Sequence, residues 1–94
     1  MKAPCVYILS SINRKVLYIG VTSNLKGRVW QHKSHYFPSF TSRYHVTRLV
    51  YFEVHDEMEH AIEKEKKLKF WRRSWKDALI TEMNPEWNDL YETL

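Results

Sequence analysis

Two tyrosines in neighbouring apolar runs are the first residues of this chain that could do chemistry. Tyr7 lies in the run CVYIL and Tyr18 lies in the run VLYIG, and the polar link SSINRK lies between them. A phenol hydroxyl can donate and accept hydrogen bonds, and it can take a proton from water if nearby positive charge lowers its pKa from about 10. The alternative is a cross-strand aromatic pair, which contributes only about 0.2–1 kcal/mol of stability.

The two rings share one face only if the link between the runs has the right parity. Side chains alternate across a strand, so an even-numbered turn puts Tyr7 opposite Tyr18 or diagonally beside it. Such a turn could centre on Ile12-Asn13 or on Asn13-Arg14. An odd-numbered turn would put the rings on opposite faces. Gly20 lies two residues after Tyr18 and leaves bare backbone beside the pair.

The segment after the second run carries an arginine and a histidine at helical spacing. Ser23-Asn24 is a typical N-cap, and the sequence LKGRVWQHK follows it. Leu25, Arg28 and His32 stand at i, i+3 and i+7, so they share one stripe of the predicted helix. Burying the side chains of Arg28 and His32 in an apolar core would be costly. A guanidinium can instead bind a phosphate, and an imidazole can transfer a proton. Arg28 and His32 are therefore candidate site residues.

A longer predicted helix has one carboxylate inside its buried stripe. Glu65 falls four residues after Ala61 and three residues before Leu68. Burying a lone carboxylate is costly, so such a group is usually paired or bound to a metal ion. The alternative to a metal ligand is an ion pair with an arginine, for which Arg28 is the candidate. The apolar residues that define the stripe are Met58, Ala61, Ile62 and Leu68.

Residues 64–76, KEKKLKFWRRSWK, concentrate the positive charge. They hold seven basic residues and one acidic residue, a local net charge of +6 in a chain of net charge +4. Basic groups beside flat rings suit a phosphate backbone and exposed bases. The alternative is a solvated helix face whose aromatic residues pack inward. The candidate nucleic-acid contacts are Lys66, Lys69, Arg72, Arg73 and Lys76.

Three strands and several helices must position these residues. Residues 3–9, 15–22 and 47–54 are rich in β-branched and aromatic residues and are predicted to be strands, the first two forming a hairpin. Helices segregated around three strands give an α+β fold, a three-stranded antiparallel sheet flanked by helices. The 94 residues suffice for one domain, residues 1–94, with a core at about 2–79 and a C-terminal helix and tail at 80–94.

The remaining segments are assigned from capping and breaking signals. Residues 34–46, around Pro38, are predicted to be a loop or a short irregular helix. Asp56 and Glu59 form a predicted capping box for a helix that continues over residues 57–72. A further helix is expected from Trp75 to Met83, where Asn84-Pro85 stops it.

The amino-acid composition limits the class of protein and its expected cellular compartment. An apolar content of 44% with two glycines and three prolines favours a compact globular chain. No apolar run approaches the roughly 20 residues that cross a bilayer, and the N-terminus lacks a signal-peptide pattern. Cys5 is the single cysteine, which excludes an intrachain disulfide and a thiolate zinc cage. We expect a chain of the reducing cytoplasm without membrane association.

Taken together and in order, these residues resemble the GIY-YIG nuclease superfamily. Tyr7 stands in CVY, and Tyr18 begins the motif YIG. Arg28 follows the glycine of that motif by eight residues, and His32 follows Arg28 by four. Glu65 ends the sequence AIEKE on a later helix. The resemblance covers essentially the whole chain and is strongest to the small stand-alone bacterial members.

The resemblance implies phosphodiester hydrolysis on a three-stranded antiparallel sheet. It implies that both tyrosines line one active-site face, that Gly20 lets the substrate backbone approach, and that Glu65 binds one divalent ion, Mg²⁺ or Mn²⁺. Arg28 would grip the phosphate, and His32 would position the water or a tyrosine hydroxyl. Either tyrosine could activate the water, and we favour Tyr7.

One further residue and two functions follow from the resemblance. Asn84 corresponds to the family's later asparagine, and a helix-stopping Asn-Pro turn is the equal alternative for it. The first function is a metal-dependent endonuclease acting on branched, nicked or damaged DNA. The second is a nucleic-acid-binding module of the same fold with little turnover. The enzyme is favoured because a pure binder needs no semi-buried carboxylate.

Overall fold

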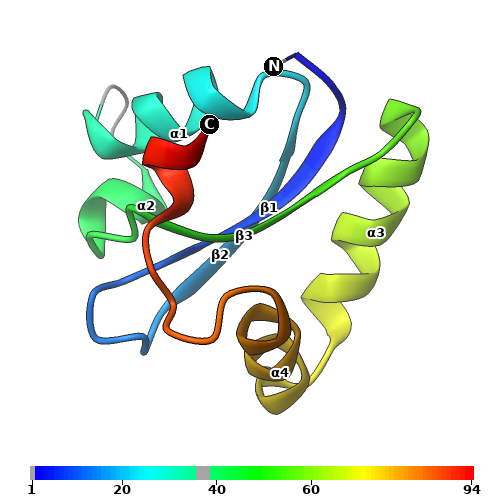
Figure 1. Ribbon diagram of the computed structural model, residues 1–94. Helices are drawn as coiled ribbons and strands as arrows, with labels where there is room; N and C mark the ends of the chain where they lie inside the picture. The colour runs from blue at the N-terminus through cyan, green and yellow to red at the C-terminus, as the bar shows by residue number, and fades with distance from the viewer. Residues whose placement is uncertain (1, 36–38) are drawn as a thin grey trace.

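A three-stranded antiparallel sheet forms the centre of the protein. The computed structural model describes residues 2–35 and 39–94. Strand β1 (Cys5–Ser10) lies in the middle of the sheet, between β2 (Leu17–Thr22) at one edge and β3 (Arg48–Val54) at the other (Figure 1). The three predicted strands and the α+β class are therefore confirmed.

The β1–β2 hairpin has the parity that brings the two tyrosines together. Residues 11–16 connect the two strands, which is an even number. Tyr7 pairs directly with Gly20, so Tyr18 is the diagonal neighbour of Tyr7 on the same face. The centroids of the two tyrosine rings are 6.3 Å apart.

Helices cover both faces of this sheet. Helix α1 (Leu25–Lys33) packs on the face that carries Tyr7, and α3 (Met58–Phe70) and α4 (Arg73–Met83) pack on the other face (Figure 1). All six residues of β1 are buried because each face has its own apolar cluster. The cluster under α1 comprises Cys5, Tyr7, Leu9, Leu25, Val29, Val46 and Leu49. The cluster under α3 and α4 comprises Val6, Ile8, Ile19, Val50, Tyr51, Leu68, Ile80 and Trp87.

The helix ends agree with the sequence prediction at α1 and depart from it at α3. Asn24 is the N-cap of α1, and its side chain accepts a hydrogen bond from the Gly27 N–H (3.3 Å). The capping box predicted at Asp56 and Glu59 is wrong. Helix α3 instead has Glu57 as its N-cap, with extended backbone and no side-chain capping bond.

The segment predicted as a loop or short irregular helix contains one short regular helix. Helix α2 (Phe40–Arg43) begins after Ser39, which forms a reciprocal capping box with Ser42. The Val46 N–H closes the helix by donating to the Thr41 carbonyl (2.9 Å). Pro38, at the centre of the segment predicted as a loop or short irregular helix, lies outside the described residues.

The C-terminal segment packs against the rest of the domain. Trp87 joins the cluster under α3 and α4, and the short 3₁₀ helix η1 (Leu90–Thr93) packs beside the cluster under α1. Asp89 accepts a hydrogen bond from the Leu49 N–H (3.1 Å) and pairs with Lys33. Among the helices of the described residues, none is long and apolar enough to cross a membrane.

Candidate active site

The Tyr7 side chain extends from the central strand across the edge strand. Its ring lies directly over Gly20, where a Cβ atom would stand 2.5 Å from the Tyr7 hydroxyl oxygen and 2.6 Å from Cζ. The Tyr7 residue is only 1% exposed, so the ring has little room to move aside. The packing of the Tyr7 ring therefore requires glycine at position 20, whether or not a substrate also approaches there.

Gly20→Ala is expected to displace the Tyr7 hydroxyl and to slow cleavage at least about tenfold. Overpacking of a buried site should also lower the free energy of unfolding by roughly 1–3 kcal/mol. Single-turnover cleavage and chemical denaturation measure the two effects on the same preparation. A variant that is destabilised but cleaves at the parental rate would show that the Tyr7 position over Gly20 has no part in the chemistry.

His32 connects the Tyr7 hydroxyl to a threonine on α2. The Tyr7 hydroxyl lies 3.0 Å from His32 Nε2, and His32 Nδ1 lies 2.8 Å from Thr41 Oγ1. Thr41 Oγ1 lies in turn 3.0 Å from Ser39 Oγ. The Tyr18 ring packs against the imidazole, with centroids 5.3 Å apart. Helix α1 thus turns His32 inward, as its spacing predicts.

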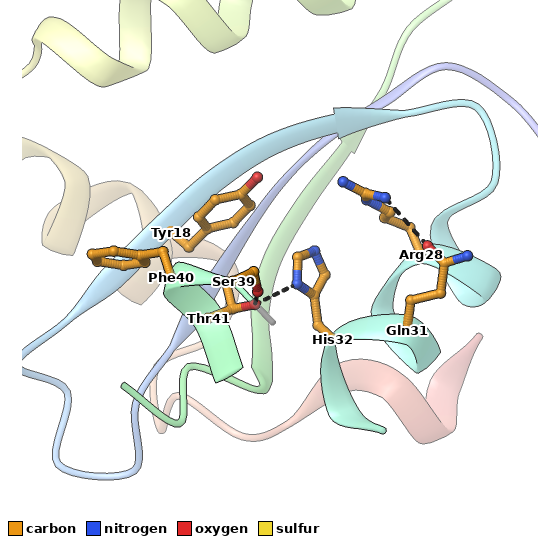
Figure 2. Close-up of a pocket in the computed structure, with 7 residues that line it drawn as sticks. All are labelled: Tyr18, Arg28, Gln31, His32, Ser39, Phe40 and Thr41. Atoms are coloured by element: carbon orange, nitrogen blue, oxygen red, sulfur yellow. Dashed lines mark hydrogen bonds between the residues drawn. The ribbon is translucent and has the colours of Figure 1, made fainter. Parts of the chain in front are cut away.

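A small cavity of about 100 Å³ opens beside this histidine. Figure 2 shows the Tyr18 hydroxyl and the Arg28 guanidinium on the same side of the imidazole, with Thr41 on the other side. Arg28 donates a hydrogen bond to Gln31 Oε1 (3.2 Å). The lining residues are Tyr18, Arg28, Gln31, His32, Ser39, Phe40 and Thr41. The cavity therefore combines one fixed positive charge with hydroxyl and imidazole groups, as an anion-binding site would.

Burial keeps the Tyr7 hydroxyl protonated. Loss of solvent raises the pKa of Tyr7 to about 12, and the charges of Tyr18 and Glu65 add to the rise. Hydrogen bonding and positive charge from Arg28 act in the opposite direction without overcoming burial. The pKa of Tyr7 is therefore not lowered, as it would be in a tyrosine that acts as a base on its own.

His32 is a neutral imidazole for the same physical reason. Burial lowers the pKa of His32 to about 4, and the positive charge of Arg28 lowers it further in the same direction. Contact with the Tyr7 hydroxyl raises the pKa of Arg28, so this guanidinium stays charged. At neutral pH the site therefore holds a cation, a neutral imidazole with one free lone pair, and a phenol.

Glu65 is half-buried on α3 and pairs with a lysine. Its side chain is 15% exposed, and its carboxylate lies 3.1 Å from Lys69 Nζ, one helical turn further on. The ion pair considered from the sequence thus has Lys69 as the partner instead of Arg28. The carboxylate is still close enough to Tyr7 to raise the pKa of that hydroxyl.

The donor set around Glu65 is compatible with a hard divalent cation. Within the described part of the chain, the grouping of metal-ligating side chains is Glu57, Glu59 and His60, which are exposed at the start of α3 and exclude Glu65. Glu65 would therefore be a single protein ligand. Mg²⁺ suits such a site, because it commonly keeps most of its water ligands and binds one or two carboxylates together with substrate phosphate oxygens.

Comparison with known proteins agrees with this arrangement. The sequence profile described as the GIY-YIG catalytic domain matches residues 3–88. The chain belongs to the GIY-YIG family. The resemblance found in the sequence is thereby confirmed, and the protein has the catalytic domain of a nuclease family.

A solved structure has the same fold as this GIY-YIG domain. The solution NMR structure of the UPF0213 protein BH0048 from Bacillus halodurans superposes with a TM-score of 0.58. The alignment covers 92% of this chain and 90% of that one, at 24% sequence identity. No curated protein matches the chain significantly.

Two lysines of the basic segment lie beside the candidate active site of this GIY-YIG domain. Lys69 and Lys76 line a groove of about 280 Å³ together with Tyr18, which also lines the smaller cavity. The other residues of the groove are Leu17, Ile19 and Phe40. The groove thus leads from the lysines of α3 and α4 to the candidate catalytic residues.

The other basic candidates have different surroundings. Arg73 donates hydrogen bonds to Asp77 (2.8 Å) and to the carbonyls of Arg14 and Lys15, so it ties α4 to the β1–β2 loop. Arg72 lies over the Trp75 ring, 5.4 Å from its centroid.

Lys66, the remaining basic candidate, is solvent-exposed. The aromatic residues of the basic segment divide between the interior and the surface. Trp71 is half-buried against the apolar cluster under α3 and α4. This inward packing is what we expect if the basic segment is a solvated helix face. Phe70, in contrast, is 91% exposed.

Asn84 lies apart from the cavity, at the end of α4. Its side-chain amide donates to the carbonyls of Val50 (3.1 Å) and Asn88 (2.8 Å), and its oxygen accepts from the Asn88 N–H (3.1 Å). Asn84 is 5% exposed and is the C-cap residue of α4. All of these contacts hold backbone segments together, as we expect if Asn84 is the residue of a helix-stopping Asn-Pro turn.

The sequence analysis missed the contribution of α2 to the cavity. Ser39, Phe40 and Thr41 line it, and none was among the candidate site residues. A signal was present, because serines three residues apart form the reciprocal capping box of a helix start. Nothing in the local sequence, however, indicates that this helix packs beside His32.

Proposed function

We propose that this GIY-YIG domain hydrolyses phosphodiester bonds in nucleic acid, with DNA as its substrate. The observation that supports this most is the contact between the Tyr7 hydroxyl and a neutral His32 (3.0 Å). Beside that contact lie the cavity and the charged Arg28, which match a phosphodiester in sign and hydrogen-bonding capacity.

In the proposed hydrolysis, some residues bind the phosphate and others transfer protons. Arg28 binds the non-bridging phosphate oxygens, and the Tyr18 hydroxyl beside it orients the substrate. The oxygen of a water molecule forms a bond to phosphorus in line with the leaving oxygen, whose own bond to phosphorus breaks. One proton of the water passes to the Tyr7 oxygen while the Tyr7 proton passes to His32 Nε2, so no free phenolate is needed. The leaving oxygen takes up a proton from solvent, and His32 later returns its proton to solvent. Burial is the larger cause of the lowered pKa of His32, and a phosphate bound at Arg28 would offset the smaller one, the positive charge of that guanidinium.

Tyr7 is proposed as the water-activating tyrosine because its hydroxyl has a proton acceptor. His32 Nε2 is 3.0 Å from the Tyr7 hydroxyl, which is hydrogen-bond distance. Tyr18 is half-buried and lines both the cavity and the basic groove, which suits contact with the substrate.

Glu65 would hold the single divalent ion, Mg²⁺ or Mn²⁺. When bound, such an ion supplies positive charge near the leaving oxygen of the phosphodiester. Lys69, which pairs with Glu65 in this structure, is 54% exposed and can turn towards solvent or substrate. The exposed carboxylates at the start of α3 are not part of this proposal.

Cleavage of labelled DNA tests the proposed function. Single-stranded, duplex, nicked and branched DNA, with matched RNA strands, are incubated with the purified protein with and without Mg²⁺. Magnesium-dependent cleavage that is lost in His32→Ala supports the hydrolase. Binding without cleavage of any of these substrates would support the alternative, a nucleic-acid-binding module of the same fold. The preferred DNA structure and the cytoplasmic location stay predictions.

The basic groove gives a separate prediction about binding. Replacing Lys69 and Lys76 by glutamine should reduce the slope of log K against log salt by about 0.9 per lost contact on duplex DNA, or about 0.7 on single strands. Binding is measured in EDTA, because Lys69 also pairs with Glu65. Lys67→Gln is the matched control, since Lys67 is exposed on the same helix and outside the groove. An equal slope in the parent and the double variant would place the nucleic-acid contacts elsewhere.

A further inference from the structure

Thr41 holds a fixed hydroxyl against the far nitrogen of His32. The residue is 1% exposed, and its Oγ1 lies 2.8 Å from His32 Nδ1. Its backbone is held by α2, because Ser39 caps the helix and the Val46 N–H binds the Thr41 carbonyl (2.9 Å). The hydroxyl is thus placed by a structured element and not by a free loop.

The hydrogen bond of the buried Tyr7 hydroxyl bears on which histidine nitrogen carries the proton. A buried O–H needs an acceptor, and the Arg28 guanidinium near the Tyr7 hydroxyl can only donate. His32 Nε2, at 3.0 Å, is that acceptor if it carries a lone pair. In a neutral imidazole the proton then resides on Nδ1.

Thr41 completes this set of donors and acceptors. Its Oγ1 can accept the His32 Nδ1–H while its own O–H donates to Ser39 Oγ, 3.0 Å away. The protons of Tyr7, His32 and Thr41 then each have an acceptor. In the opposite arrangement Nε2–H points at the Tyr7 oxygen, and the buried phenol proton loses its acceptor. An unpaired buried donor is costly, so the first arrangement is favoured.

We propose that Thr41 is a positioning residue that holds His32 in the Nδ1–H tautomer, which leaves Nε2 free to receive the proton of Tyr7. The consequence for catalysis rests on the proposed function of this site. The tautomer itself does not, since it follows from the hydrogen bonds of the protein without substrate.

NMR of the imidazole nitrogens tests the tautomer directly. Long-range ¹H–¹⁵N correlation distinguishes a protonated ring nitrogen from one with a lone pair, and His32→Gln identifies the signals. The parent protein should show protonated Nδ1 and unprotonated Nε2. Thr41→Val, which keeps the side-chain shape, should shift His32 towards the Nε2–H form, whereas Thr41→Ser should retain the parental pattern. An Nε2–H tautomer in the parent, or an unchanged tautomer in a folded Thr41→Val, would overturn the proposal.

Kinetics then test the consequence for catalysis. Thr41→Val should lower kcat at least about tenfold with little change in KM, and Thr41→Ser should restore most of it. A histidine in the wrong tautomer costs about 10⁴-fold in a serine protease, which is an upper guide. If Thr41→Val fails to fold, the parental NMR pattern and the activity of Thr41→Ser still decide the matter. A parent with the expected tautomer and no cleavage of any substrate would contradict the proposed function and leave the role of Thr41 in holding the tautomer intact.

Discussion

Tyr7→Phe is expected to slow cleavage by about 100-fold or more, the usual scale of general acid–base catalysis. Phenylalanine keeps the ring that lies over Gly20, so packing is preserved and only the hydroxyl is lost. Loss of its hydrogen bond to His32 should lower the free energy of unfolding by about 1 kcal/mol, and by up to about 3 kcal/mol if the buried nitrogen stays unpaired. Single-turnover rates at saturating substrate, with denaturation curves, separate the two effects.

Tyr18→Phe and the double variant complete this comparison. Tyr18→Phe should also slow cleavage far more than it weakens binding, because its hydroxyl lies in the cavity beside Arg28. The second substitution should add less than its single effect, since groups that act together on one reaction step are not additive. If both single variants cleave at the parental rate, the tyrosines are an aromatic pair and the hairpin has no catalytic role.

Glu65→Gln is expected to abolish magnesium-dependent cleavage while the fold and most of the nucleic-acid affinity remain. The amide has nearly the shape of the carboxylate and can still accept a hydrogen bond from Lys69, but it lacks the charge that a hard cation requires. Loss of a partly exposed ion pair should change the free energy of unfolding by about 1 kcal/mol or less. Cleavage, thermal unfolding and Mn²⁺ binding followed by electron paramagnetic resonance provide three separate readouts.

Glu63→Gln is the matched control for this substitution. Glu63 is exposed on the same helix, two residues away. Its substitution therefore removes the same charge and leaves the half-buried Glu65 unchanged. The control should retain both Mn²⁺ binding and cleavage. Magnesium-dependent cleavage that persists in Glu65→Gln would rule out Glu65 as the metal ligand, and equal Mn²⁺ affinity in both variants would point to a different site for the ion.

Several features of the fold could be predicted because they depend on neighbours in the chain. Alternation along the strands predicts that Tyr7 and Tyr18 share a face if the connection between the strands is even-numbered, and the register shows that they do. Asn24 could be assigned as an N-cap because its own side chain reaches the first turn of the helix. The capping box at Asp56 and Glu59 failed because α3 begins only after Glu57, whose extended backbone precedes the helix.

Contacts between distant segments were decided by the tertiary structure. Nearby positive charge would lower the pKa of Tyr7, and Arg28 acts in that direction, but only the packed structure gives the degree of burial, which outweighs that charge and raises the pKa. Arg73, a candidate nucleic-acid contact from the sequence, also binds the β1–β2 loop, and only the fold shows that contact.

The sequence by itself determined which chemical groups this protein has and which way most of them face. Strand alternation and helical spacing depend only on backbone geometry within a few residues, so the face of His32 could be assigned from the printed chain. The face of Tyr7 relative to Tyr18 also required the parity of the connection between their strands, which the register supplies. The tertiary structure decided what those groups touch. The 3.0 Å contact of Tyr7 with His32 and the 2.8 Å contact of His32 with Thr41 each join separate elements. Such distances depend on how helices pack against the sheet, which no local pattern specifies.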